Sequence, residues 1–153
     1  MSENFIVLIE DSPDDVVLTK TAFKQSGFFV EIIDFQDGIE AVNFLHCQGR
    51  YQGRTPTLPR AVLVDLKLPI IDGPTIIKKI KSHPLTKLVP VIALTTSVEE
   101  NEIEQCYREG ANSYLKKPID FSEFLNMTKS IGQYWLELNI PVTTLGSVDN
   151  SNS

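Results

Sequence analysis

Three carboxylates, one hydroxyl and one ammonium group stand at the ends of short apolar runs in this sequence. They are Glu10 and Asp11 after the first run, Asp65 in a later one, and Thr95 and Lys117 at the ends of two more. In an open sheet of parallel strands, ligands bind outside the carboxyl ends of the strands. If the apolar runs are strands of one sheet, these five side chains converge on a single cleft.

The three carboxylates would repel one another in such a cleft, and burial would strengthen the repulsion. One of them would keep its proton unless a cation lay among them. The available ligands are all oxygens, which favour Mg²⁺ or Mn²⁺ over zinc. The sequence therefore predicts a magnesium site formed by Glu10, Asp11 and Asp65.

The neighbouring polar groups suit a phosphoryl group. A divalent cation and the Lys117 ammonium would neutralise its oxygens, and the Thr95 hydroxyl would donate a hydrogen bond to it. Asp65 is the lone acid at the end of an apolar run, which makes it the candidate nucleophile. Its attack on a phosphoryl group would give an aspartyl phosphate.

The elements that must position these residues are five strands alternating with five helices. Apolar runs predict strands over 5–9, 30–35, 61–66, 91–94 and 113–115. Apolar residues at helical spacing predict helices over 13–25, 38–48, 74–82, 98–109 and 121–138. This alternation predicts an α/β, doubly wound, five-stranded parallel sheet with helices on both faces. We expect one domain over 4–138 and a disordered, polar tail over 139–153.

Several other residues fit purely structural roles. Ser12 is placed to cap the first helix, and Asp14 and Asp15 fit as charges at its positive end. His46 and His83 are expected at the surface. The inner face of the first helix is expected to carry Val17, Leu18, Ala22 and Phe23.

In this order, the polar residues resemble the receiver domain of two-component response regulators, and the resemblance covers residues 4–138. The acid pair, the segment 65–73 with its Pro and Asp-Gly, Thr95, and Lys117 followed by Pro118 all fit the family's motif. Tyr114, three residues before the lysine, fits an aromatic switch position. The resemblance implies a flavodoxin-like fold with strand order 2-1-3-4-5.

The resemblance also implies roles at the acidic end of the site. Asp65 would accept a phosphoryl group from a sensor histidine kinase. Mg²⁺ would be held directly by Asp11, Asp65 and the backbone carbonyl of Lys67, and by Glu10 through water. The protein would be no enzyme in the usual sense, but a phosphoacceptor with weak autophosphatase activity.

At the other end of the site, Thr95 and Tyr114 would act as the switch and Lys117 would bind the phosphoryl group. The peptide bond before Pro118 would be cis. Thr96 stands where a smaller residue is common in the family, so it is a secondary candidate that would affect the lifetime of the phosphoryl group, as would the Lys67 side chain.

A finer resemblance concerns the loop 49–53, the strand end 94–97 and the segment 134–136. These are similar to the single-domain regulators that partner bacterial phytochrome kinases. That similarity implies a phytochrome-like sensor kinase as the partner. Trp135, an aromatic residue near the end of the chain, fits either packing within the domain or contact with a second copy of the chain, and both alternatives stay open.

Composition narrows the classes of function. The chain has 153 residues and a formal net charge of −6, which argues against direct nucleic-acid binding. Its longest unbroken apolar run has five residues, over 5–9, so we expect no membrane span and no secretory leader. Two cysteines, Cys47 and Cys106, make no disulfide framework. We therefore expect a cytoplasmic protein.

Two other functions deserve comparison. A receiver fold that acts only as a phosphorylation-independent docking module would be favoured by loss of the phosphoacceptor or the lysine, and both residues are present. A flavodoxin-like electron carrier needs a neutral loop after the first strand to hold the flavin phosphate. Here that loop carries Glu10, Asp11, Asp14 and Asp15, which would repel the phosphate.

Overall fold

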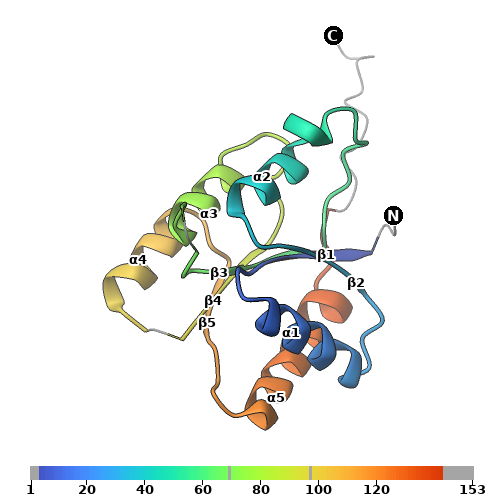
Figure 1. Ribbon diagram of the computed structural model, residues 1–153, viewed down its shortest axis with the longest axis vertical. Coiled ribbons are helices and arrows are strands. Elements are labelled where there is room, and N and C mark those ends of the chain that lie inside the picture. Colours follow the sequence, from blue (N-terminus) through green and yellow to red (C-terminus); the bar gives the residue numbers. More distant parts are fainter. Residues whose placement is uncertain (1–3, 69, 97, 143–153) are drawn as a thin grey trace.

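Five parallel strands form one sheet in the computed structural model, which describes residues 4–68, 70–96 and 98–142 (Figure 1). The strand order is β2-β1-β3-β4-β5, which confirms the predicted doubly wound fold. The strands are β1 (Phe5–Ile9), β2 (Glu31–Phe35), β3 (Ala61–Asp65), β4 (Val91–Thr95) and β5 (Ser113–Lys116). Because every pairing is parallel, all five carboxyl ends lie at the same edge of the sheet.

The central strands β1, β3 and β4 are buried along their whole length, whereas β2 and β5 are partly exposed at the two sides of the sheet. This burial follows from apolar side chains on both faces of each central strand, as is typical of parallel sheets. The predicted strands match the observed ones within one residue at each end.

Helices cover both faces of the sheet (Figure 1). One face carries α1 (Pro13–Gln25) and α5 (Phe121–Gly132), and the other carries α2 (Gly38–His46), α3 (Gly73–Lys81) and α4 (Glu100–Arg108). Each face has its own apolar core, one built on Phe5 and Val7 and the other on Ile6 and Leu8. Alternate side chains of β1 thus serve opposite cores.

Side chains before the helices cap their first turns. Ser12 accepts a hydrogen bond from the backbone N–H of Asp15, as its position in the sequence predicted. Asp37, Asp72 and Asp120 accept equivalent bonds at the starts of α2, α3 and α5. These caps satisfy N–H groups that have no partner within the helix.

The prediction for the inner face of α1 was partly wrong. Val17 is exposed, and Val16 and Thr19 lie in the interior together with Ala22 and Phe23. The buried positions follow one another at helical steps from Val16, and two adjacent valines gave no way to tell which of them begins that stripe.

Two helices are shorter than predicted. The helix expected to reach residue 48 ends at His46, because Cys47 takes a left-handed conformation with φ of 55°. The helix expected from residue 98 begins at Glu100.

The predicted helix 121–138 has the expected extent but changes geometry on the way. After α5 the chain continues as a π-helical turn, Gln133–Leu138. The Arg60 guanidinium donates hydrogen bonds to the carbonyls of Trp135, Leu136 and Asn139. Arg60 thereby supplies donors to carbonyls that lack partners at a helix end, and ties that end to the start of β3.

The end of the chain is only partly described. Of the tail predicted to be disordered, residues 143–153 lie outside the described residues. In the part of the chain that is described, no helix is both long and apolar enough to cross a bilayer.

Candidate functional site

The five polar residues singled out in the sequence meet at the carboxyl edge of the sheet. Glu10 follows β1 directly, Asp65 ends β3, Thr95 ends β4, and Lys117 follows β5. Asp11 lies beside them and is exposed. The convergence predicted from strand ends is confirmed for the side chains of Glu10, Asp11, Asp65 and Lys117, and Thr95 lies at the end of the adjacent strand.

Lys117 lies between two of the acids. Its Nζ is 2.8 Å from Glu10 Oε2 and 3.3 Å from Asp65 Oδ2. All three side chains are buried, with 2%, 9% and 9% of Glu10, Asp65 and Lys117 exposed. The other oxygen of Asp65, Oδ1, accepts a hydrogen bond of 2.8 Å from the backbone N–H of Lys67. The candidate nucleophile is therefore fixed from two sides.

Burial and neighbouring charges shift the pKa values of the two buried acids in opposite directions. Burial, with the hydrogen bond to Asp65, raises the pKa of Glu10 to about 7. Burial would also raise the pKa of Asp65, but the hydrogen bonds from Glu10 and the Lys67 N–H, with the charge of Lys117, hold it below its usual value. Asp65 is thus the ionised member, as a nucleophile requires.

Lys117 keeps its charge in spite of burial. Burial alone would lower the pKa of Lys117, but the hydrogen bond to Glu10 and the negative charges of Asp65, Glu10 and Asp15 raise it above its usual value. A permanent ammonium beside Asp65 suits the binding of a second anionic group there.

The acids can also hold a cation. Carboxylate oxygens of Glu10, Asp11 and Asp65 lie within 4.8 Å of one another, close enough for one ion to touch all three. Burial is the main cause that raises the pKa of Glu10, and a cation bound beside it would favour its ionised form. An all-oxygen set of this kind fits a hard divalent cation such as Mg²⁺ or Mn²⁺.

Sequence reasoning missed one acid of the site. Asp15, interpreted as a helix-start charge, lies with Oδ2 3.5 Å from Lys117 Nζ. It lies on the first turn of α1, three residues after the capping Ser12 and close to the end of β1, and that position was the available signal. Asp15 also borders a small cavity of about 170 Å³ with Thr96 and Lys117, which places Thr96 next to the site.

The predicted switch residues lie together on the neighbouring strands. Thr95 is fully buried, and its carbonyl accepts a 2.6 Å hydrogen bond from the Lys117 N–H. The Tyr114 ring packs against the core, and its hydroxyl donates to Glu102 Oε1 on α4 at 3.0 Å. Sequence reasoning did not find Glu102.

One expectation drawn from the resemblance is wrong in this structure. The peptide bond between Lys117 and Pro118 is trans, as is every peptide bond of the described residues. The trans isomer is the intrinsically favoured one for an X–Pro bond, and the Lys117 N–H still reaches the Thr95 carbonyl with it. The Lys67 side chain is exposed, and it is the backbone of this residue that contacts Asp65.

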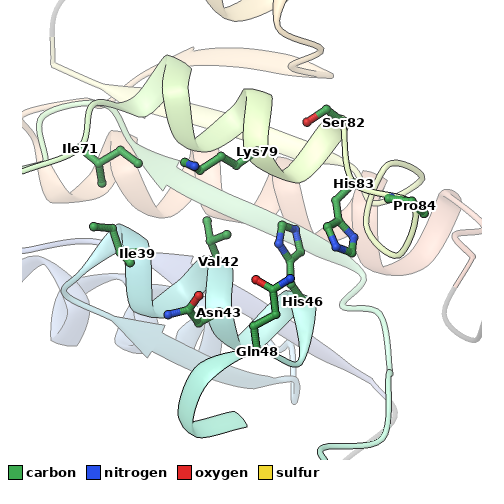
Figure 2. Close-up of a pocket in the computed structure, with 10 residues that line it drawn as sticks. All are labelled: Ile39, Val42, Asn43, His46, Gln48, Ile71, Lys79, Ser82, His83 and Pro84. Carbon is green, nitrogen blue, oxygen red and sulfur yellow. The ribbon is translucent and has the colours of Figure 1, made fainter. Parts of the chain in front are cut away.

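A larger cavity lies away from the acids, between α2 and α3, with a volume of about 460 Å³ (Figure 2). His46 and His83 stack on one side of it, with ring centroids 3.8 Å apart. The prediction that His46 lies at the surface was wrong, since it is 7% exposed and its Nε2 is 3.1 Å from Thr86 Oγ1. The turn after α3 covers it, which the sequence of α2 alone does not reveal.

Comparison with known proteins decides the family. The family model described as "Response regulator receiver domain" matches residues 6–129. The chain belongs to this receiver domain family. The matched range contains every residue of the site, from Glu10 to Lys117.

Individual relatives agree with this assignment. Response regulator Rcp1 of Synechocystis sp. is 37% identical over 132 residues, which cover 86% of this chain and 88% of the relative. The probable methanogenesis regulatory protein FilR2 of Methanothrix harundinacea is 35% identical over 134 residues, covering 88% and 84% of the two chains.

Solved structures give the same result. The phosphorylated cyanobacterial phytochrome response regulator RcpA superposes with a TM-score of 0.84 at 31% identity, covering 94% of this chain and all of that one. The Mn²⁺-bound form of Rcp1 superposes with a TM-score of 0.81 at 34% identity, covering 91% and 99%. This receiver domain is therefore similar to phytochrome-associated single-domain regulators in sequence and in fold.

Proposed function

We propose that this receiver domain accepts a phosphoryl group on Asp65 from a sensor histidine kinase. The observation that carries the proposal is the position of Asp65, ionised, buried and fixed between the Lys67 N–H and Lys117 Nζ at the end of β3. As an Asp65 oxygen forms its bond to phosphorus, the bond from phosphorus to the kinase imidazole nitrogen breaks.

Each surrounding residue has a part in this transfer. Lys117 would bind a phosphoryl oxygen, because its ammonium is already beside Asp65 and can exchange a carboxylate partner for the new anion. Thr95, buried at the end of the adjacent strand, would donate its hydroxyl to another oxygen. The Lys67 N–H keeps the Asp65 carboxylate oriented throughout.

Glu10, Asp11 and Asp65 would hold Mg²⁺, with the backbone carbonyl of Lys67 as a further ligand. The ion would neutralise charge on the phosphoryl oxygens during transfer. The mutual distances within the cluster support this role. The relative Rcp1 has been solved in a Mn²⁺-bound form, which supports a divalent cation as the ligand here.

For the partner, we propose a phytochrome-like sensor histidine kinase, because RcpA is a phytochrome response regulator. Output would then run through the surface formed by α4, β5 and α5, to another protein or a second copy of the chain. Exposed Tyr107 on α4 and exposed Tyr134 on the π-helical turn after α5 support such a contact. Free Cys47 and Cys106 fit a reducing cytoplasm as the setting.

The proposal includes the reverse chemistry. Slow hydrolysis of the aspartyl phosphate would reset the protein, and Thr96 and Lys67, which lie beside the site, would influence its rate. A change of either residue alters the room and polarity available to the attacking water.

The test is phosphorylation by acetyl phosphate with Mg²⁺, followed by intact mass. We expect one added phosphoryl group that is lost at alkaline pH, and none in Asp65→Asn, which keeps the shape of the side chain but removes the attacking oxygen. Asp14→Asn is the matched control, because this exposed acid lies on the first turn of α1 and its change alters the net charge equally. Uptake of phosphate by Asp65→Asn at the wild-type rate would contradict the proposal.

A further inference from the structure

Three side chains from three neighbouring elements form a chain of hydrogen bonds beside the site. The Tyr114 hydroxyl on β5 donates to Glu102 Oε1 on α4 at 3.0 Å. Thr95 at the end of β4 also hydrogen-bonds the Tyr114 hydroxyl. Burial and Glu102 raise the pKa of this phenol, whereas the bond with Thr95 acts to lower it, as a bond donated to the phenol oxygen does. Figure 1 shows α4 alongside β4 and β5 at this side of the sheet.

The direction of these bonds matters, because each hydroxyl has only one proton. Tyr114 gives its proton to Glu102, so its oxygen accepts from Thr95. The proposed phosphoryl group on Asp65 would claim the same Thr95 proton. Tyr114 would then lose its contact with Thr95 and keep its contact with Glu102.

Glu102 differs from the nearby Glu104 on α4 in its exposure and in its partner. Glu104 is exposed and pairs with Arg108 one turn further along the same helix. Glu102 is only partly exposed and reaches inward to the strand. The Tyr114 ring packs against the core, and its hydroxyl reaches Glu102 from there.

We infer that Glu102 is the positioning residue that holds the Tyr114 ring inward once Thr95 turns to the phosphoryl group, and so couples Asp65 to α4. The inference rests on the proposed function and adds a residue to it. Without phosphate, Tyr114 has two partners and tolerates the loss of one. With phosphate, Glu102 is the hydrogen-bond partner that remains to it among the described contacts, so the phosphorylated form depends on Glu102 more strongly.

The experiment compares beryllofluoride binding, with Mg²⁺ present, in wild type and variants by NMR titration. Glu102→Ala should bind this phosphoryl analogue about fivefold more weakly, because the Tyr114 hydroxyl can still bond Thr95 in the free form but loses both partners in the bound form. Glu102→Gln should bind within about twofold of wild type, because its amide oxygen still accepts from Tyr114. Glu104→Ala is the matched control on the same helix and should bind as wild type does.

A second readout follows the ring itself. The Tyr114 ring signals, assigned by their absence in Tyr114→Phe, should broaden or shift toward solvent-exposed values in Glu102→Ala only when beryllofluoride is bound. In a Tyr114→Phe background, Glu102→Ala should have no further effect, since the partner of the carboxylate has been removed.

The outcomes separate the inference from the proposed function. If wild type binds no beryllofluoride, the proposed function and the inference are both wrong. If wild type binds but Glu102→Ala binds equally well, or loses the same affinity without the Tyr114 hydroxyl, Glu102 does not act through Tyr114 and the inference alone is overturned.

Discussion

The buried histidine of α2 should make the fold less stable at mildly acidic pH than at neutral pH. Burial, with the nearby charges of His83 and Lys79, lowers the pKa of His46 to about 4. An unfolded chain binds this proton near the usual pKa of about 6.5. Between these values the unfolded state takes up a proton that the folded state refuses, so the free energy of unfolding falls as pH falls from about 6.5 toward 4.

The hydrogen bonds around His46 give the physical cause. The Thr86 hydroxyl donates its single proton to the Ile80 carbonyl at 2.6 Å, so His46 Nε2 must donate to the Thr86 oxygen. A second proton would have to go on Nδ1, in a buried ring stacked on His83 (Figure 2). The two pKa values imply a loss of about 2 kcal/mol at pH 5, and about 3 kcal/mol below pH 4.

The assay is urea denaturation of wild type and His46→Phe at several pH values between 7.5 and 4.5. A phenyl ring keeps the planar shape but cannot titrate. From pH 7.5 to 5, the free energy of unfolding of wild type should therefore fall by about 2 kcal/mol relative to that of His46→Phe. His83→Gln should retain most of the acid dependence, because burial is the larger cause and the charge of His83 the smaller. Parallel pH profiles for wild type and His46→Phe would refute the reasoning.

Much of the fold was predictable because it depends on patterns that are local in sequence. Each central strand is a short apolar run that needs burial on both faces, and Ser12 shows its capping role in the order of residues alone. The strand order is a different matter, because no local pattern sets which parallel strands pair. That order came from the resemblance, and the structure confirms it.

The acidic end of the site was predictable for the same reason. Glu10, Asp65 and Lys117 each follow or end a strand, and the fold brings all parallel strand ends to one edge. Asp15 and Glu102 escaped because they lie on helices, where the partner of a charged side chain depends on the rotation of the helix against the sheet. Val17 and His46 were misplaced by the same uncertainty of helix facing.

Substitutions at Gly132 and Ile70 give further predictions, because each should change stability in the direction opposite to the usual effect of the new residue. Gly132→Ala should destabilise the fold by about 1–3 kcal/mol in thermal or urea unfolding, although alanine is normally the better helix former, because its Cβ would run into the Phe28 ring. Adding Phe28→Val to the Gly132→Ala variant should relieve that clash. A Gly132→Ala variant that is no less stable than wild type would contradict the packing. Ile70→Gly should stabilise by about 0.5–1 kcal/mol, because Ile70 is a β-branched residue at φ of 72° with 85% of its surface exposed, and relief of that strain exceeds the entropy that glycine adds to the unfolded chain. Ile140→Gly is the matched control, an equally exposed isoleucine without the positive φ, and it should bring no gain. Equal effects of the two isoleucine changes would mean that the loop after Asp65 carries no such strain.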